Sequence, residues 1–190
     1  MINKDLIQEK FLFFYKFLQS PGRVGSVTPS SRFLAKTMVD AIPWNEVDSA
    51  AELGAGTGAI TRYIWSARKE STRVLLFEAD PQMRGRLEDL YPKFACYPDC
   101  RDIQAAVHKE KLGQLDCVLS GLPFFNFTQE LRDRILEQVV SSLKDNGLFV
   151  AFQYSQQMRK QLEEVFDIEE IKFVPMNVPP AFVYICRKKG

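Results

Sequence analysis

Along most of the chain, short apolar runs alternate with longer segments whose apolar residues recur at helical spacing. The alternation begins at residue 49 and predicts strands at 49–53, 73–78, 94–97, 115–120, 148–153, 168–174 and 181–187. The segments between them predict five helices. One follows the glycines at 54, 56 and 58 and ends near 68, one begins at Asp80-Pro81, one ends near 109, and two cover 128–143 and 156–165. Strands and helices in alternation are typical of an α/β protein with a doubly wound, mostly parallel sheet.

The first 42 residues follow a different pattern and predict two added helices. Residues 4–19 place Leu6, Phe11 and Phe14 at helical spacing, and Pro21-Gly22 ends that helix. A second helix is predicted over 31–41. The aromatic side of the first helix allows two interpretations: a lid over the sheet edge or over a site, or an amphipathic helix in a membrane interface. Both remain open at this point.

Length and composition favour one domain. With 190 residues and 46% hydrophobic content, the chain can bury a single sizeable core. We therefore expect one domain over 1–190, with N-terminal helices or a lid over 1–42 and a Rossmann-like core over 43–190.

Charge and cysteine usage narrow the function classes. Basic and acidic residues number 25 and 24, so no overall field favours nucleic acid as a partner. Four cysteines without a C-x-x-C pair and a single histidine predict no metal site. No signal peptide and no apolar run of the ~20 residues needed to span a bilayer is evident. We expect a cytoplasmic protein. Peripheral contact with the inner membrane face is compatible with that expectation.

Three glycines at alternate positions follow the first core strand. Gly54, Gly56 and Gly58 enclose Ala55 and Thr57, and Glu52 precedes them within the strand. Glycines allow a tight turn and close approach of a ligand, and the helix that follows directs its unpaired N–H groups at that turn. The spacing differs from G-x-G-x-x-G, and the acidic residue suits a ligand with a cationic amino-acid end. A glycine-rich surface turn is the alternative.

Polar residues also close the next strands, and ligands of open α/β sheets bind at the carboxyl ends of strands. Glu78 ends the second strand, where a carboxylate can accept from both ribose hydroxyls of a nucleoside. Asp99 follows the third strand, where it can accept from an adenine amino group or simply cap a helix. The segment 120–125 follows the fourth strand, where a group to be modified would lie.

The glycine segment resembles motif I of the class I S-adenosylmethionine (SAM) methyltransferases. The order of motifs is similar to that of the rRNA adenine dimethylase superfamily and, within it, most similar to the bacterial phospholipid N-methyltransferases. The resemblance covers about residues 10–187 and rests on Gly25-Ser26-Val27-Thr28-Pro29-Ser30-Ser31-Arg32, Ser120-Gly121-Leu122-Pro123-Phe124 and Val178-Pro179-Pro180-Ala181-Phe182-Val183-Tyr184. It implies a seven-stranded Rossmann-like sheet with an antiparallel last strand. It also implies SAM as cofactor, bound by Ser26, Thr28, Glu52, Gly54, Ala55, Gly56, Thr57, Gly58, Glu78, Ala79, Asp99, Cys100 and Ser120.

One departure from the dimethylase pattern bears on the substrate. Those RNA enzymes use Asn-Leu-Pro-Tyr, whereas this chain has Gly121 and Phe124 at the first and last positions. Gly121 has no amide to accept from an aromatic amine, so an aliphatic amine is the better substrate. We also expect neither the separate C-terminal helical domain nor the basic surface with which those enzymes bind RNA. The expected reacting groups come from Tyr15, Ser120, Leu122, Pro123, Phe124 and Asn126.

The proton acceptor for such an amine stays open among Tyr15, Asn126, Tyr154 and the backbone carbonyls of Ser120 and Leu122. We expect a SAM-dependent N-methyltransferase acting on a phospholipid headgroup similar to phosphatidylethanolamine, with peripheral membrane contact through residues 4–19. The alternatives are a methyltransferase of a soluble small molecule or quinone, an rRNA adenine N6-methyltransferase and a non-catalytic nucleotide-binding module.

Overall fold

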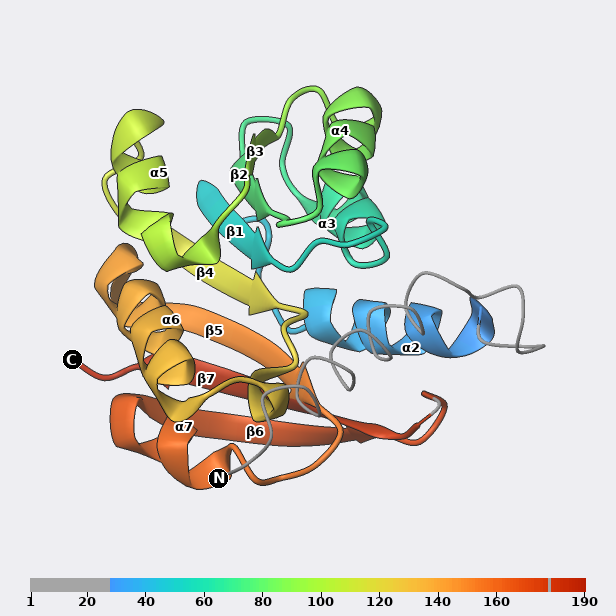
Figure 1. Ribbon diagram of the computed structural model, residues 1–190, viewed down its shortest axis with the longest axis vertical. Coiled ribbons are helices and arrows are strands. Elements are labelled where there is room, and N and C mark those ends of the chain that lie inside the picture. The colour runs from blue at the N-terminus through green and yellow to red at the C-terminus, as the bar shows by residue number, and fades with distance from the viewer. Residues whose placement is uncertain (1–27, 178) are drawn as a thin grey trace.

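The computed structural model describes residues 28–177 and 179–190, with side chains from residue 32 onward. It contains one seven-stranded sheet in the order β3-β2-β1-β4-β5-β7-β6 (Figure 1). The strands are β1 (Ser49–Leu53), β2 (Arg73–Phe77), β3 (Ala95–Tyr97), β4 (Leu115–Ser120), β5 (Leu143–Gln153), β6 (Phe166–Val174) and β7 (Ala181–Lys188). Strand β7 pairs antiparallel with both β5 and β6, and the other pairs are parallel. The predicted sheet and its antiparallel last strand are confirmed.

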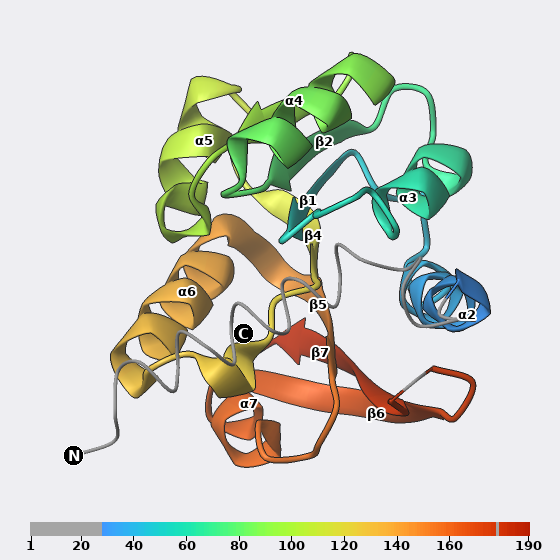
Figure 2. The same ribbon diagram turned by 45° about the vertical axis from the view of Figure 1, so that its right-hand side comes forward.

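Helices cover both faces of this sheet (Figure 2). The α-helices are α2 (Thr28–Val39), α3 (Thr61–Ala67), α4 (Pro81–Leu90), α5 (Ile103–Lys109), α6 (Gln129–Ser142) and α7 (Arg159–Val165), with 3₁₀ turns η1 (Cys100–Asp102) and η2 (Phe124–Asn126). One core lies under α2, α3 and α4, and includes Met38 and Ile64. The other lies under α5, α6 and α7, and includes Phe149 and Phe166. Parallel strands buried on both faces explain the nearly continuous apolar runs of the sequence.

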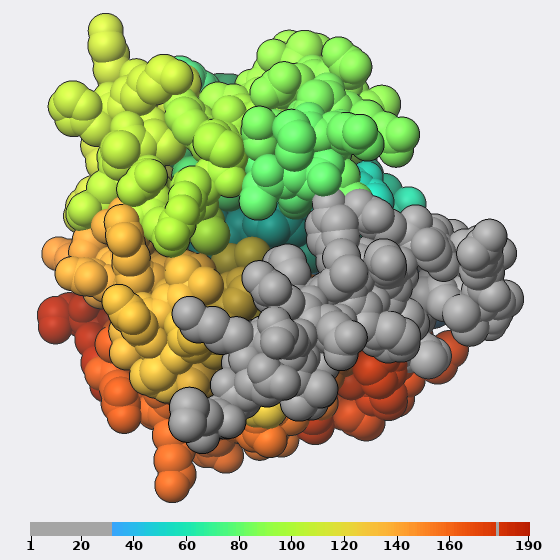
Figure 3. Space-filling view, in the orientation of Figure 1, coloured from blue at the N-terminus to red at the C-terminus, as the bar shows by residue number. Residues whose placement is uncertain are grey.

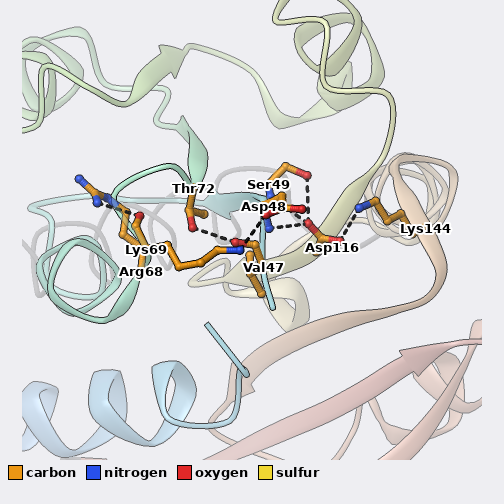
Figure 4. Close-up of polar contacts among 8 residues, drawn as sticks. All are labelled: Val47, Asp48, Ser49, Arg68, Lys69, Thr72, Asp116 and Lys144. Atoms are coloured by element: carbon orange, nitrogen blue, oxygen red, sulfur yellow. Dashed lines mark hydrogen bonds and ion pairs between the residues drawn. The ribbon is translucent and has the colours of Figure 1, made fainter. Parts of the chain in front are cut away.

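A polar cluster fixes the amino ends of the central strands (Figure 4). Asp116 of β4 accepts from the backbone N–H groups of Asp48 and Ser49, each at 2.9 Å, and pairs with Lys144 of β5 at 2.5 Å. Lys69 also pairs with Asp48, at 2.7 Å. Three neighbouring strands are thereby held in register at the edge opposite to the glycine turn.

Predicted boundaries differ from the observed ones mainly where a turn and a strand compete. The strand expected from residue 148 begins at Leu143, which already pairs with Leu115 of β4. The pairing then shifts in register before Leu148, and Asn146 in between has a φ of 61°. Asp80 caps α4 as expected, accepting from the N–H groups of Gln82 and Met83, and Pro81 takes the first helical position.

Several predictions fall outside the described residues. The expected helix over 4–19, with Tyr15, and the position of Ser26 belong to the part of the chain that is not described, as does the side chain of Thr28 at the start of α2. Within the described residues, no helix is long and apolar enough to cross a membrane.

Candidate active site

The predicted polar residues meet at the carboxyl edge of the sheet, around the turn after β1. The space-filling view shows this region recessed, with teal atoms of the β1 segment visible between the green surface of α4 and α5 and the orange surface of α6 (Figure 3). Strands β1, β2 and β4 are paired in parallel, so Leu53, Phe77 and Ser120 end side by side. The turns that follow these residues form the candidate site.

The glycine turn has a backbone that other residues rarely adopt. Gly54, Gly56 and Gly58 have φ values of 72°, 55° and 83°. A Cβ on Gly54 would lie 2.9 Å from the side chain of Leu122, whereas a Cβ on Gly56 would meet nothing closer than the Gly54 carbonyl oxygen at 4.0 Å. Another residue at position 54 would be strained by the positive φ and would press on Leu122, whereas among the described residues nothing fills the space beside Gly56. A turn with its backbone exposed beside a helix start can receive a ligand closely.

Glu52 is buried beneath this turn with an unsatisfied oxygen. Its side chain is 0% exposed, and Oε2 accepts from the hydroxyl of Thr61 at 2.7 Å. Oε1 has no hydrogen-bond partner among the described residues. Burial, with help from the charge of Glu78, raises the pKa of Glu52 to about 8. A cation placed nearby would stabilise the ionised form, so this carboxyl fits the amino-acid end of a ligand.

Glu78 connects the glycine turn to the start of α4. One carboxylate oxygen accepts from the N–H of Gly56 and the other from the N–H of Asp80, both at 2.8 Å. Each oxygen can accept a further hydrogen bond. Glu78 is 7% exposed, so ribose hydroxyls would meet an oriented and largely desolvated carboxylate. Ala79 beside it is exposed.

Asp99 caps the turn after β3. Its carboxylate accepts from the backbone N–H of Arg101 at 2.8 Å and forms an ion pair with the guanidinium of the same residue. This pairing lowers the pKa of Asp99. Cys100 follows at the start of η1, and burial raises its pKa to about 12, so the thiol stays protonated at neutral pH. The role of Asp99 toward an adenine group remains a prediction.

The segment after β4 packs directly on the glycine turn. The N–H of Gly121 donates to the Leu53 carbonyl at 2.8 Å, and a Cβ on Gly121 would lie 3.1 Å from the carbonyl oxygen of Gly54. The N–H of Leu122 donates to the buried Ser120 hydroxyl at 3.2 Å. Position 121 is therefore too close to the glycine turn for a larger side chain to fit without movement.

The Leu122 carbonyl is fully paired. It accepts from the N–H of Phe124 at 2.9 Å and from the side-chain amide of Gln153 at 3.0 Å. A carbonyl oxygen has two lone pairs, so this carbonyl cannot also accept from a substrate amine without losing a bond. Its place among the candidate proton acceptors remains a prediction.

The remaining expected residues after β4 differ in exposure. The ring of Phe124 is 1% exposed and packs edge-on against Phe127 and Phe149, so it supports the segment from the core side. Pro123 precedes η2, and the half-buried Asn126 ends it. Tyr154 hydrogen-bonds to Asn177 of the β6–β7 connection. Direct contact of these residues with a substrate remains a prediction.

Sequence reasoning missed Thr61 and Gln153. Thr61 is the first residue of α3, and nothing in the sequence marks it as the partner of Glu52. Gln153 closes the apolar run of β5, as Glu78 closes that of β2. A polar residue at the carboxyl end of an apolar strand was the signal that identified Glu78, and it applies equally to Gln153.

The residues present fit SAM as the bound group. A glycine turn with room above Gly56, a buried carboxylate with an unpaired oxygen and the oriented carboxylate of Glu78 match a ligand with a cationic amino-acid end and a ribose. No group of three or more potential metal-binding side chains occurs within the described part of the chain.

Comparisons with known proteins agree with this site. No protein-family model matches the chain. A curated relative, the ornithine lipid N-methyltransferase of Singulisphaera acidiphila, is 33% identical over 190 residues, covering 95% of this chain and 97% of the relative.

Two solved methyltransferases share the fold. The N-methyltransferase NodS of Bradyrhizobium japonicum in complex with S-adenosylhomocysteine matches with a TM-score of 0.73 at 13% identity, over 93% of this chain and 98% of that one. Magnesium protoporphyrin IX methyltransferase of Synechocystis with bound SAM matches with a TM-score of 0.69 at 11% identity, over 98% and 95%. The chain is therefore a SAM-dependent N-methyltransferase and belongs to the family of the ornithine lipid N-methyltransferase.

Proposed function

We propose that this enzyme methylates the amine of a phospholipid headgroup similar to phosphatidylethanolamine. The observation that carries the proposal is the 33% identity, over nearly the whole of both chains, to an enzyme named for N-methylation of an amine-bearing lipid. Gly121 supports it, because a residue without a side-chain amide occupies the position where the RNA dimethylases carry the asparagine that accepts from an adenine amine.

The chain's own residues divide between holding the cofactor and aligning the amine. Bound SAM supplies a methyl group activated by a sulfonium. Glu52, the glycine turn and Glu78 hold its amino-acid and ribose parts, with Asp99 near the base. Ser120 and Leu122 shape the segment that faces the acceptor. Catalysis of such a transfer rests mainly on alignment of the reacting atoms.

An aliphatic amine must first lose a proton. With a pKa near that of lysine, removing the proton at pH 7 costs about 4 kcal/mol. Acceptors at the site offset part of this cost by binding the N–H groups of the neutral amine. Tyr15, Asn126 and Tyr154 are the side chains proposed on sequence grounds.

The proposal includes peripheral contact with the inner membrane face through residues 4–19. A lipid amine lies at the membrane surface, so an enzyme that acts on it must reach that surface. The apolar and aromatic positions of this segment suit burial at the acyl boundary, and Lys4, Lys10 and Lys16 suit anionic headgroups.

The test is mass spectrometry of lipid extracts from cells that express the protein. Amine lipids should gain mass in steps of one methylene, and a Glu78→Ala strain expressing equal amounts of protein should lack these products. Purified protein with SAM should reproduce the products on phosphatidylethanolamine. Methylation of soluble amines or quinones with no change in any lipid would overturn the lipid assignment and leave the methyltransferase assignment intact.

A further inference from the structure

The amide of Gln153 lies where strands β4 and β5 end together. Ser120 pairs with Ala151, so Gln153, two residues further along β5, stands beside Leu122. Its amide nitrogen donates to the Leu122 carbonyl at 3.0 Å, and the residue is 4% exposed. A carbonyl oxygen can only accept a hydrogen bond, so the amide group of Gln153 must direct its nitrogen toward Leu122. Its oxygen, Oε1, is then directed away from that carbonyl.

The oxygen of this amide receives no hydrogen bond from the described residues. The hydrogen bond that the Gln153 side chain forms among them is the one that its amide nitrogen donates to Leu122. The neighbouring Leu122 carbonyl is already paired twice. Beside the segment after β4, the side chain of Gln153 is therefore a better candidate hydrogen-bond acceptor than the backbone carbonyl of Leu122.

We infer that Gln153 Oε1 accepts the N–H of the substrate amine and so supplies, from the end of β5, the amide that Gly121 cannot supply. This inference rests on the proposed function. A Cβ at position 121 would lie 3.1 Å from the Gly54 carbonyl oxygen, so glycine allows the observed close packing, and an amide at this edge comes here from another strand. Gln153 is held by Leu122, whereas no described residue holds the side chain of Asn126. A pre-oriented acceptor stabilises the reacting geometry without reorganisation.

In this arrangement the amide of Gln153 orients the neutral amine. The lone pair of the amine nitrogen forms the new bond to the methyl carbon. The S–C bond breaks, its electron pair returns to sulfur, and the methylated ammonium gives its N–H proton to water. An amine that already carries two methyl groups has no N–H in its neutral form, so the hydrogen bond to Gln153 serves the first two transfers and not the third.

The test compares Gln153→Leu and Gln153→Glu with Gln157→Leu, which removes an exposed glutamine a few residues away. Leucine matches glutamine closely in size, and Leu122 keeps its bond from Phe124, so the fold should be retained. With dihexanoyl-phosphatidylethanolamine, Gln153→Leu should lower kcat by about 100-fold. Its calorimetric affinity for S-adenosylhomocysteine and its Tm should stay equal to those of Gln157→Leu.

Three further measurements separate hydrogen bonding from packing. Protein loaded with S-adenosylhomocysteine should bind the same lipid about 10-fold more weakly in Gln153→Leu. The N,N-dimethyl form of the lipid should show a much smaller loss of kcat than the primary amine. Gln153→Glu, which keeps an acceptor oxygen, should recover part of the rate and change the pH profile of kcat.

Two results would overturn the inference while leaving the proposed function in place. One is a kcat for Gln153→Leu within about threefold of that of Gln157→Leu. The other is an equal loss of kcat for primary and dimethylated amines together with weaker binding of S-adenosylhomocysteine, which indicates a packing role. If the wild-type enzyme methylates no amine lipid, the proposed function fails and the inference fails with it.

Discussion

The burial of Glu52 lowers the stability of the fold at neutral pH, and the same residue is one of those proposed to bind the cofactor. In the unfolded chain its pKa lies near 4.5, and in the fold burial raises it to about 8. Between these values the unfolded chain has lost the proton that the folded chain still holds, so this residue makes stability fall as pH rises from 4.5 toward 8. Glu78, Tyr91 and Cys96 are the titratable groups that interact with it.

We predict that Glu52→Gln stabilises the protein at pH 8 and weakens SAM binding. Glutamine keeps an acceptor for Thr61 and cannot ionise, so the free energy of unfolding without ligand should rise by more than about 1 kcal/mol. Urea unfolding at pH 5 and pH 8 checks this, since the gain should shrink at pH 5. A variant less stable than wild type at pH 8 would contradict the raised pKa.

A second prediction concerns Glu78. Glu78→Ala removes the acceptor for the Gly56 N–H and the proposed partner of the ribose, and should weaken binding of S-adenosylhomocysteine by about 10–100-fold. Calorimetry on the folded variant measures the change. Asp89→Ala, which removes an exposed carboxylate from the same helix region, should bind as the wild type does. Equal affinities for the two variants would remove Glu78 from the cofactor site.

At the scale of elements, the glycine turn can be tested with a matched pair of substitutions. Gly56 and Gly113 have φ values of 55° and 70°. Counting the described residues alone, an added Cβ meets nothing closer than 4.0 Å at Gly56 and nothing within 4 Å at Gly113. Both alanine variants should therefore lose about 1–2 kcal/mol of stability through backbone strain alone.

Only Gly56→Ala should also lose affinity for SAM, because its methyl group would occupy the space that borders the turn. Gly113 lies between α5 and β4, away from that turn, and its variant should bind normally. Thermal unfolding and calorimetry on the two proteins make the comparison. Normal binding by Gly56→Ala would mean that this turn is not in contact with the cofactor.

The elements themselves follow from the sequence more completely than their contacts do. Period and composition predict each strand, and a polar residue after an apolar run identifies Glu78 at its edge. The order of strands does not follow from periodicity, because periodicity says which residues form a strand and not which strands are neighbours. The resemblance to known methyltransferases implied the antiparallel last strand, and the order of the strands comes from the structure.

The contacts inside the site could not be predicted either, because the sequence does not show which side chains are neighbours in the fold. The pairing of Glu52 with Thr61 and the double pairing of the Leu122 carbonyl depend on how closely two turns approach. That approach is set by tertiary packing, and the sequence shows only that glycines permit it. The site role of each residue named from sequence remains a prediction that the variants above can test.

For the whole molecule, we predict weak and salt-dependent attachment to anionic vesicles. The phenylalanines of residues 4–19 would each contribute about 1.5–3 kcal/mol if fully buried, and the lysines about 1 kcal/mol apiece near an anionic surface. Asp5 and Glu9 offset part of the charge. Flotation with anionic and neutral vesicles at low and high salt measures this attachment.

The double variant Phe11→Ser/Phe14→Ser should no longer float with anionic vesicles. Leu90→Ser is the control, because Leu90 is 64% exposed at the end of α4, a helix that runs back from the carboxyl edge of the sheet. Its removal should change nothing. If wild-type protein floats with neither vesicle type, with or without SAM, residues 4–19 act as a lid, and a soluble substrate becomes the better proposal.

The Asp116 cluster at the amino ends of β1, β4 and β5 separates two tasks across the sheet. It fixes the strands at one edge by contacts that do not involve the turns at the other. Substitutions in the segment after β4 therefore leave the contacts of Asp116 with Asp48, Ser49 and Lys144 in place. A laboratory evolving the enzyme toward a new amine can leave the Asp116 edge alone and place its mutations at the opposite one.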